Sequence, residues 1–205
     1  MKNYKLIFAL IVLSMTSCIG IYNRMSHLNE DELEWVTNCK PGDKAYFYSD
    51  RGNIETLKIT ELEIHNSRNP FYFYSIDHDP GNYRAKAFCK FNLNGKNTDL
   101  KGRISVSKDA KTDELGFHSF LGRMQSHYTA RIISDDTADY DLTVDFRPQT
   151  FVINKKTITD CIVVNLQNSS NLATTDDVEE FVVSKHYGLI KYTKPDGEVF
   201  IRKIP

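Results

Sequence analysis

Residues 178–203, VEEFVVSKHYGLIKYTKPDGEVFIRK, carry the clearest structural pattern in this 205-residue chain. They predict three successive antiparallel strands, at residues 181–185, 189–193 and 198–203. Tyr187 and Gly188 interrupt the first apolar run, and the KPDG sequence at 194–197 predicts a tight turn. Proline pre-sets the φ angle of such a turn, and Asp-Gly tolerates left-handed backbone angles. The end of the chain is therefore predicted to complete an antiparallel sheet.

The clearest half-buried strand upstream is residues 83–93, in which apolar and polar residues alternate. Its apolar face is expected to contain Tyr83, Ala85, Ala87, Cys89, Phe91 and Leu93, with Phe88 as the exception on the polar face. In residues 54–64 the apolar phase shifts, from Leu57 and Ile59 to Leu62 and Ile64. One extra residue near Thr60, a β-bulge, would restore a single buried face.

Other short apolar runs extend the predicted sheet. They are residues 45–49, 71–76, 100–106, 128–133, 142–146, 150–153 and 158–166. Residues 108–125 lack a clear pattern, and we expect a long loop there. Strands joined mostly by short turns predict a mainly all-β fold, in which a curved antiparallel sheet forms a partial barrel or a sandwich. An aromatic content of 12% suits the cross-strand pairs of such a sheet.

A short N-terminal helix is expected in residues 28–36, LNEDELEWV. Asn29 can act as its N-cap, and Glu32, three residues later, would complete a capping box. Leu33 and Val36 share one helical face with Trp35 beside them, which predicts a helix that covers one end of the sheet. For Trp35 we favour the core over a ligand site, because a single aromatic residue on a short helix usually packs.

The first eighteen residues have the pattern of an export signal. Lys2 and Lys5 form a positive region, and residues 6–13, LIFALIVL, are apolar but too few to span a bilayer. Cys18 follows small residues, in an arrangement that resembles a bacterial lipoprotein box and implies lipidation of Cys18. The alternative is an ordinary cleaved signal with an incidental cysteine. We expect a signal peptide at 1–17, a tether at 18–27 and a single β-rich domain at 28–205.

Location and charge limit the expected partners. A lipidated Cys18 would hold the protein on a membrane surface. No acidic run follows Cys18, unlike the export signal of some gut-bacterial surface lipoproteins, so we expect the periplasmic face of the outer membrane. The formal net charge of −1 offers no basic field, and no nucleic-acid partner is expected.

Three cysteines remain besides Cys18, namely Cys39, Cys89 and Cys161. An odd number permits at most one disulfide among them, with three pairings open. Cys89 lies on the apolar side of its strand and Cys161 precedes an apolar run, so both are expected to be small buried hydrophobes. The sequence places no histidine beside a cysteine as a base, and thiol catalysis is not predicted.

Three short motifs contain residue types that occur in metal, catalytic or modification sites. Asp77-His78-Asp79 carries three potential metal ligands, but Pro80-Gly81 explains it as a turn and the sequence shows no further ligands at diagnostic spacing. Ser105 and Lys108 have S-x-x-K spacing without the partner motifs of penicillin-binding families. Asp136-Thr137-Ala138 resembles an O-glycan acceptor of exported Bacteroidota proteins, which makes Thr137 a candidate glycosylation site. We predict no catalytic residue, metal site or cofactor.

The chain contains the short segments Gly42-Asp43, Phe47-Tyr48-Ser49, Glu55-Thr56-Leu57, Asn69-Pro70-Phe71-Tyr72, Asp160-Cys161-Ile162 and Ser184-Lys185-His186-Tyr187-Gly188-Leu189-Ile190. Together these segments resemble uncharacterised lipoproteins of Bacteroidota. That family has no agreed function, so the resemblance implies no catalytic residues. The Tyr-Gly-Leu-Ile run before a glycine-containing hairpin is also similar to the closing strands of lipoprotein-carrier half-barrels, which cradle acyl chains.

These observations predict a lipid-anchored envelope protein that is not an enzyme. The first hypothesis is that the curved sheet binds or scaffolds an apolar ligand. The alternative is a protein-interaction lipoprotein, for instance an inhibitor or an accessory subunit of an envelope complex. An interior hollow on the order of several hundred cubic ångströms would favour the ligand, and a filled interior would favour the interaction.

Overall fold

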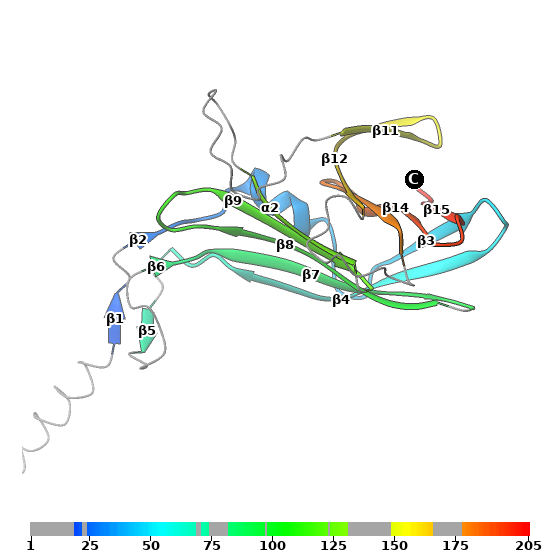
Figure 1. Cartoon of the computed structure of the whole chain (residues 1–205). Coiled ribbons are helices and arrows are strands. Elements are labelled where there is room, and N and C mark those ends of the chain that lie inside the picture. Colours follow the sequence, from blue (N-terminus) through cyan, green and yellow to red (C-terminus); the bar gives the residue numbers. More distant parts are fainter. Residues whose placement is uncertain are drawn as a thin grey trace, which may run out of the picture.

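A computed structural model of the chain describes residues 19–21, 24–68, 71–73, 82–96, 98–122, 124–130, 149–165 and 178–205 (Figure 1). These ranges contain fifteen strands and one short helix, which confirms the predicted fold class. Eleven strands form one antiparallel sheet, and the other four form two small pairs. No helix in the described ranges is both long and apolar enough to cross a membrane.

The main sheet is continuous but not closed. In spatial order its strands are β10 (Met124–Ala130), β9 (Leu115–Leu121), β8 (Thr98–Lys108), β7 (Lys86–Gly95), β4 (Ile54–His65), β3 (Lys44–Ser49), β15 (Val199–Arg202), β14 (Gly188–Thr193), β13 (Glu180–Ser184), β12 (Lys156–Asn165) and β11 (Gln149–Ile153). The sheet curls until β10, at one edge, approaches β12 near the other edge. The two edge strands β10 and β11 do not pair with each other, so the sheet is an open partial barrel.

The predicted C-terminal meander is confirmed, and its last strand joins the two halves of the sheet. β15 pairs with β14 on one side and with β3 on the other. The turn before β15 has the expected geometry: the Gly197 N–H donates to the Lys194 carbonyl over 2.9 Å, and Gly197 has a φ of +80°. Phe200 is fully buried, whereas its neighbour Ile201 faces outward.

The predicted bulge in β4 is also present. The register with β7 shifts between Ile59 and Glu61, which makes Thr60 the extra residue. Leu57, before the bulge, belongs to the core, and Leu62, after the bulge, packs against the same core. The extra residue therefore returns Leu62 to the core side, whereas Ile64, expected on the same buried face, is 45% exposed near the end of the strand.

The alternation predicted around β7 is confirmed. The inward residues Ala85, Ala87, Cys89, Phe91 and Leu93 are each at most 3% exposed. Phe88 is buried on the outward face, because the Arg103 guanidinium lies 4.2 Å and the Lys90 Nζ 5.0 Å from its ring centroid. Cation–π contacts of this kind explain why an aromatic residue interrupts the polar face.

The expected long loop at residues 108–125 is wrong, because β9 and the start of β10 occupy much of it. In β9 the buried positions are Phe117, Ser119 and Leu121, while Phe120 alternates with them. A polar residue on the inward face and an aromatic residue on the other face conceal the period of two. The strand expected at residues 142–146 lies outside the described residues.

Part of the expected tether contacts the folded domain. The strand β1 (Ile19–Ile21) pairs antiparallel with β5 (Phe71–Phe73), and β2 (Arg24–Met25) pairs parallel with β6 (Asn82–Tyr83). Directly after β2, Ser26 is buried, and its Oγ donates to the Lys108 carbonyl over 2.7 Å. The described residues between 19 and 27 thus approach the sheet before the helix begins.

The helix α2 (Glu30–Thr37) has the predicted capping box. The Glu32 N–H donates to Asn29 Oδ1 over 2.8 Å, and the Asn29 N–H donates to Glu32 Oε2 over 2.8 Å. Trp35 is 5% exposed and meets the Phe117 ring edge-on at 5.1 Å between centroids. The core interpretation of Trp35 is therefore confirmed.

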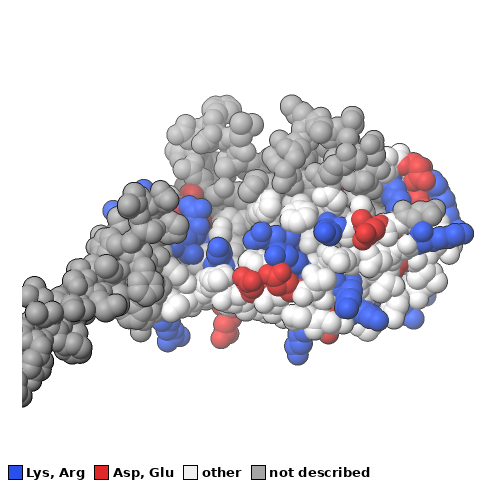
Figure 2. Space-filling view, turned by 90° about the horizontal axis from the view of Figure 1, so that it is seen from below, with Lys and Arg blue, Asp and Glu red and all other residues white. Residues whose placement is uncertain are grey.

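Side chains fill the concave side of the curved sheet. One large apolar cluster joins α2 to both halves of the sheet, and it includes Trp35, Phe47, Phe91, Phe181 and Phe200. A smaller cluster on the opposite face of the C-terminal strands contains Ile153, Ile158, Cys161, Val182, Ile190 and Ile204. On the convex side, away from α2, charged side chains are scattered among uncharged ones (Figure 2).

Candidate functional site

The two predicted modification sites lie outside the described residues. Neither Cys18 nor Thr137 is described, and the same holds for the Asp77-His78-Asp79 turn. In the described ranges, no group of three or more His, Cys, Asp or Glu residues could hold a metal ion. Lipidation of Cys18 and glycosylation of Thr137 remain predictions. Three other features carry the argument about function: a buried polar cluster, an exposed apolar patch and a hollow.

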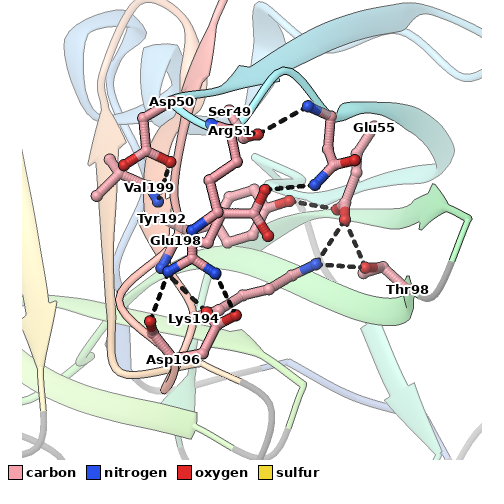
Figure 3. Close-up of polar contacts among 11 residues, drawn as sticks. Ser49, Asp50, Arg51, Glu55, Thr98, Tyr192, Lys194, Asp196, Glu198 and Val199 are labelled. Atoms are coloured by element: carbon pink, nitrogen blue, oxygen red, sulfur yellow. Dashed lines mark hydrogen bonds and ion pairs between the residues drawn. The ribbon is translucent and has the colours of Figure 1, made fainter.

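The buried polar cluster lies at the end of the concave side where β4 begins and the β7–β8 hairpin turns (Figure 3). Its centre is Glu55, whose side chain is 4% exposed. Lys194 Nζ lies 2.7 Å from Glu55 Oε1, and Thr98 donates to the same oxygen. The Tyr192 hydroxyl donates to Oε2. The buried carboxylate therefore has a cation and two hydroxyl donors, as a charge in a low-dielectric core requires.

Aromatic packing holds these partners in place. The Tyr192 ring stacks on Phe200 with 4.8 Å between centroids and an angle of 4° between planes. Lys194 Nζ lies 4.6 Å from the centroid of the same Phe200 ring. Gly95 leaves room for the acid, since a Cβ at that position would lie 2.6 Å from Glu55 Cγ. The site of Glu55 thus depends on a glycine in the adjoining hairpin.

A second buried carboxylate, Glu198, extends the cluster. Asn53 Nδ2 donates to Glu198 Oε1 over 2.7 Å, and Ser49 also forms a hydrogen bond with the carboxylate. These two bonds, that of Ser49 first, hold the pKa of Glu198 below its usual value. Arg51 and Asp196 form an exposed ion pair at the surface of the same end, with 2.7 Å between Nη1 and Oδ2.

The polar cluster has a structural role, because it links neighbouring strands through buried hydrogen bonds. Burial, followed by the hydrogen bond to Glu55, raises the pKa of the Tyr192 hydroxyl, so Tyr192 stays protonated and acts as a donor. Lys194 Nζ also lies 2.7 Å from Thr98 Oγ1, which links the cation to both other groups. The polar groups satisfy one another and tie β4, β8 and β14 together at this end of the sheet.

On the convex face, four large apolar side chains lie together in the open. Tyr46, Tyr48, Ile54 and Ile201 are between 37% and 56% exposed. Tyr48 is the Cα partner of Ile54 on β4 and of Ile201 on β15, and Tyr46 lies two residues earlier on the same face of β3. These four residues are called the convex patch below. Adjacent strands thus join them into one apolar surface.

Exposed lysines border the convex patch. Lys44 and Lys58 are Cα partners on β3 and β4, directly beside the patch. Lys203 follows β15, and its N–H donates to the Tyr46 carbonyl over 2.8 Å. Like charges directly opposite each other destabilise a pair of strands. An anionic group held against Lys44 and Lys58 would relieve that repulsion.

The convex patch lies far from the N-terminal strands. β1 is at one end of the molecule, and the β3–β4 hairpin, which carries Tyr48 and Ile54 near its tip, extends at the other (Figure 1). β4 contains 12 residues. At about 3.3 Å per residue such a strand is about 40 Å long. Any attachment through residue 18 would therefore leave the patch well away from the attached end.

A hollow lies near the N-terminal end, between the start of α2 and the residues after β4. It has a volume of about 630 Å³, and its walls include His27, Leu28, Leu33, Asn66 and Arg68. Two hydrogen bonds fix one wall: the Leu28 N–H donates to Asn66 Oδ1 over 3.0 Å, and Asn66 Nδ2 donates to the Leu28 carbonyl over 2.7 Å. Two leucines beside a histidine and an arginine suit an apolar molecule with a polar end.

No protein-family model, curated protein or solved structure matches this chain. The argument about function therefore rests on the arrangement of its own residues.

Sequence reasoning did not identify these features. Glu55 stands two residues before Leu57 on the inward face of β4, and a charged residue at an inward position was the available signal. The convex patch had no comparable signal, because Tyr48, Ile54 and Ile201 become neighbours only through the register of three strands.

Proposed function

We propose that this protein is a lipid-anchored, non-catalytic component of the bacterial cell envelope that binds a partner protein through the convex patch. The observation that carries the proposal is the exposure of Tyr48 between Ile54 and Ile201. Tyrosine side chains are enriched at protein interfaces, where an apolar centre is surrounded by a polar rim. The attachment would be the lipidated Cys18, on the periplasmic face of the outer membrane.

The bordering lysines define the chemistry of the partner. A matching surface would have an apolar centre and carboxylates that face Lys44, Lys58 and Lys203. Complementary charges of this kind set the orientation of a complex and speed the encounter. The distance between the patch and the N-terminal strands favours a protein over the membrane that holds the anchor.

The packed concave side supports the same choice. Trp35 and Phe200 occupy the space in which an apolar ligand of a half-barrel would be expected to lie. The interaction hypothesis therefore has better support than ligand binding inside the sheet.

Site-specific photocrosslinking in intact cells tests this proposal. A photoreactive phenylalanine analogue replaces Tyr48, and a matched control carries it at Lys86, an exposed position at the far end of the convex face. We expect one discrete protein adduct from position 48 and none from position 86. Lys44→Glu with Lys58→Glu should abolish the adduct, and changing facing acids of the identified partner to lysine should restore it.

Three results would overturn the proposal. They are an adduct that contains two copies of this chain, an adduct with lipid, and the absence of any adduct from position 48. Thermal unfolding of the Lys44→Glu, Lys58→Glu variant serves as the folding control. Both lysines are exposed, so its Tm should stay close to that of the wild type.

A second candidate function is the binding of a small apolar ligand in the hollow beside α2. The observation that favours it is the volume of about 630 Å³ lined by Leu28 and Leu33. Native mass spectrometry after gentle extraction should then show a retained molecule, which Leu33→Trp should displace by filling the hollow. A wild-type protein that is always empty would count against this candidate.

A further inference from the structure

Cys39 and Cys89 are distant in the sequence and meet in the concave core. Cys39 follows α2 and is 7% exposed, while Cys89 is fully buried on the inward face of β7. A hydrogen bond joins the two thiols. Neither thiol is engaged in a disulfide in this structure.

An independent contact also places Cys39 close to Cys89. A Cβ built on Gly188 would lie 3.4 Å from Cys39 Sγ and 3.8 Å from Ile104 Cδ1. Ile104 is the Cα partner of Cys89 across β7 and β8. Cys39 therefore lies against the same part of the sheet that carries Cys89.

The third thiol belongs to a different environment. Cys161 is buried in the smaller apolar cluster, which does not include Cys39 or Cys89. Its Sγ donates weakly to the carbonyls of Ile158 and Thr159, at 3.7 Å and 3.5 Å. Of the three pairings that the sequence leaves open, the fold brings together only one.

We propose that Cys39 and Cys89 form a disulfide when the chain folds in the envelope, and that Cys161 remains a free thiol. This inference rests on the envelope location proposed above, because stable disulfides belong to oxidising compartments. The oxidant would be a small or protein disulfide of that compartment. Both thiols are buried in the folded chain, so the exchange would take place before the core closes.

The exchange balances in two steps. The Cys39 thiolate attacks one sulfur of the oxidant disulfide, forms a mixed disulfide and displaces the first oxidant thiolate. The Cys89 sulfur then attacks Cys39 Sγ, which forms the intramolecular bond and displaces the second oxidant thiolate. Two electrons pass to the oxidant, and the two protons of the cysteine thiols end on its two sulfurs.

The thiols differ in pKa once the core has closed. The hydrogen bond from Cys89 lowers the pKa of Cys39, burial opposes that shift, and the nearby Arg202 guanidinium adds to it. By contrast, burial raises the pKa of Cys161 to about 11. A thiolate is the reactive form in disulfide exchange, so the raised pKa keeps Cys161 an unreactive thiol in the folded chain.

Thiol trapping and peptide mapping of the wild-type protein test the inference. The protein is extracted in detergent from its own envelope, alkylated with iodoacetamide in denaturant without reductant, digested and analysed by mass spectrometry. We expect a linked peptide pair that contains Cys39 and Cys89, two hydrogen atoms lighter than its parts, and an alkylated Cys161. Alkylated Cys39 and Cys89, or a link that contains Cys161, would overturn the inference.

A second arm separates the pairing from the location. The extracted protein is reduced, unfolded and refolded with oxidised glutathione, which should form the same Cys39–Cys89 link. If the chain is absent from the envelope but the Cys39–Cys89 link still forms during refolding, the proposed envelope location is refuted and the proposed cysteine pairing is supported. Cys161→Ser is the matched variant that should keep the link, whereas Cys39→Ser should leave Cys89 open to alkylation. If refolding gives no Cys39–Cys89 link, the pairing itself is refuted.

Discussion

Glu55 shows most directly how a single residue stabilises this fold. Glu55→Ala would remove the acceptor of the Tyr192 hydroxyl and the carboxylate that pairs with Lys194 in a nearly buried site. We expect the free energy of unfolding to fall by about 3 kcal/mol, because unpaired buried polar groups pay their full desolvation cost. Urea denaturation measures the change.

Arg51→Ala is the control for that experiment. It removes an ion pair of the same end whose two side chains are 49% and 58% exposed. Exposed pairs contribute little, so the urea midpoint should hardly move. If Arg51→Ala lowers the free energy of unfolding as much as Glu55→Ala does, the role assigned to Glu55 is contradicted.

Glu198 makes the stability depend on pH. Its pKa is lowered in the folded chain by hydrogen bonds from Ser49 and Asn53, so its contribution is present above the unfolded pKa of about 4.3 and is lost as the pH falls through the folded value. Glu198→Gln should therefore be less stable than the wild type at neutral pH. The difference should narrow below about pH 4, because a protonated Glu198 resembles glutamine.

Thermal unfolding of both proteins across the acid range measures this difference. Glu30→Gln, at an exposed position on α2, is the control and should track the wild type more closely at every pH. If the difference in stability between Glu198→Gln and the wild type stays constant on acidification, Glu198 is not the source of the pH dependence.

At the level of single residues, the sequence identified positions with local signals and missed those that depend on distant neighbours. Trp35 was predicted in the core from its helical position, and the buried face of β7 from its alternation. The partners of Glu55 could not be predicted in this way. Tyr192 and Lys194 lie more than a hundred residues from Glu55, and only the pairing of β15 with β3 brings them near.

The contribution of the capping box to stability can be tested in α2, the only helix in the described ranges. Asn29→Ala would remove the acceptor for the Glu32 N–H, with an expected loss of about 1 kcal/mol in the free energy of unfolding. Chemical denaturation measures it, with Asn38→Ala at the other end of α2 as the control. The Asn38 amide makes only a long contact of 3.4 Å to the Glu34 carbonyl, so its loss should matter less. A larger effect at Asn38 would argue against the capping role.

Strands and helix were predictable where side-chain period and turn chemistry agree. The bulge at Thr60 followed from a phase shift, and the last hairpin followed from its Asp-Gly turn. β9 was missed because Ser119 is buried and Phe120 lies on the opposite face, which inverts the usual pattern at two adjacent positions. Tertiary packing overrode the local signal there.

The whole molecule carries the prediction about attachment. Cys18→Ala should move the exported protein from the membrane fraction to the soluble fraction, because the acylated sulfur would be its main hold on the bilayer. Fractionation with immunoblotting measures this, and circular dichroism should still report a β-rich protein. Cys161→Ser should remain in the membrane fraction. A Cys18→Ala protein that stays just as firmly bound would contradict the anchor.

The general curvature of the sheet was predictable from many short strands, but the way in which it is filled was not. The approach of β10 to β12 and the position of α2 on the concave side arise from contacts between the two ends of the sheet. No local pattern specifies them. For the same reason the sequence left ligand binding and protein interaction as alternatives.

The length of β4 would set the distance between the proposed membrane anchor and the convex patch. Because one end of this strand adjoins the N-terminal strands and the other carries Ile54, a docked molecule would be held at a set height above the bilayer. Two residues added to β4 and to each strand beside it would raise that height by about 7 Å and keep every side chain on its face. One residue added to each strand without a bulge such as that at Thr60 would turn the tyrosines inward, so steps of two residues are the ones that preserve the regular ladder.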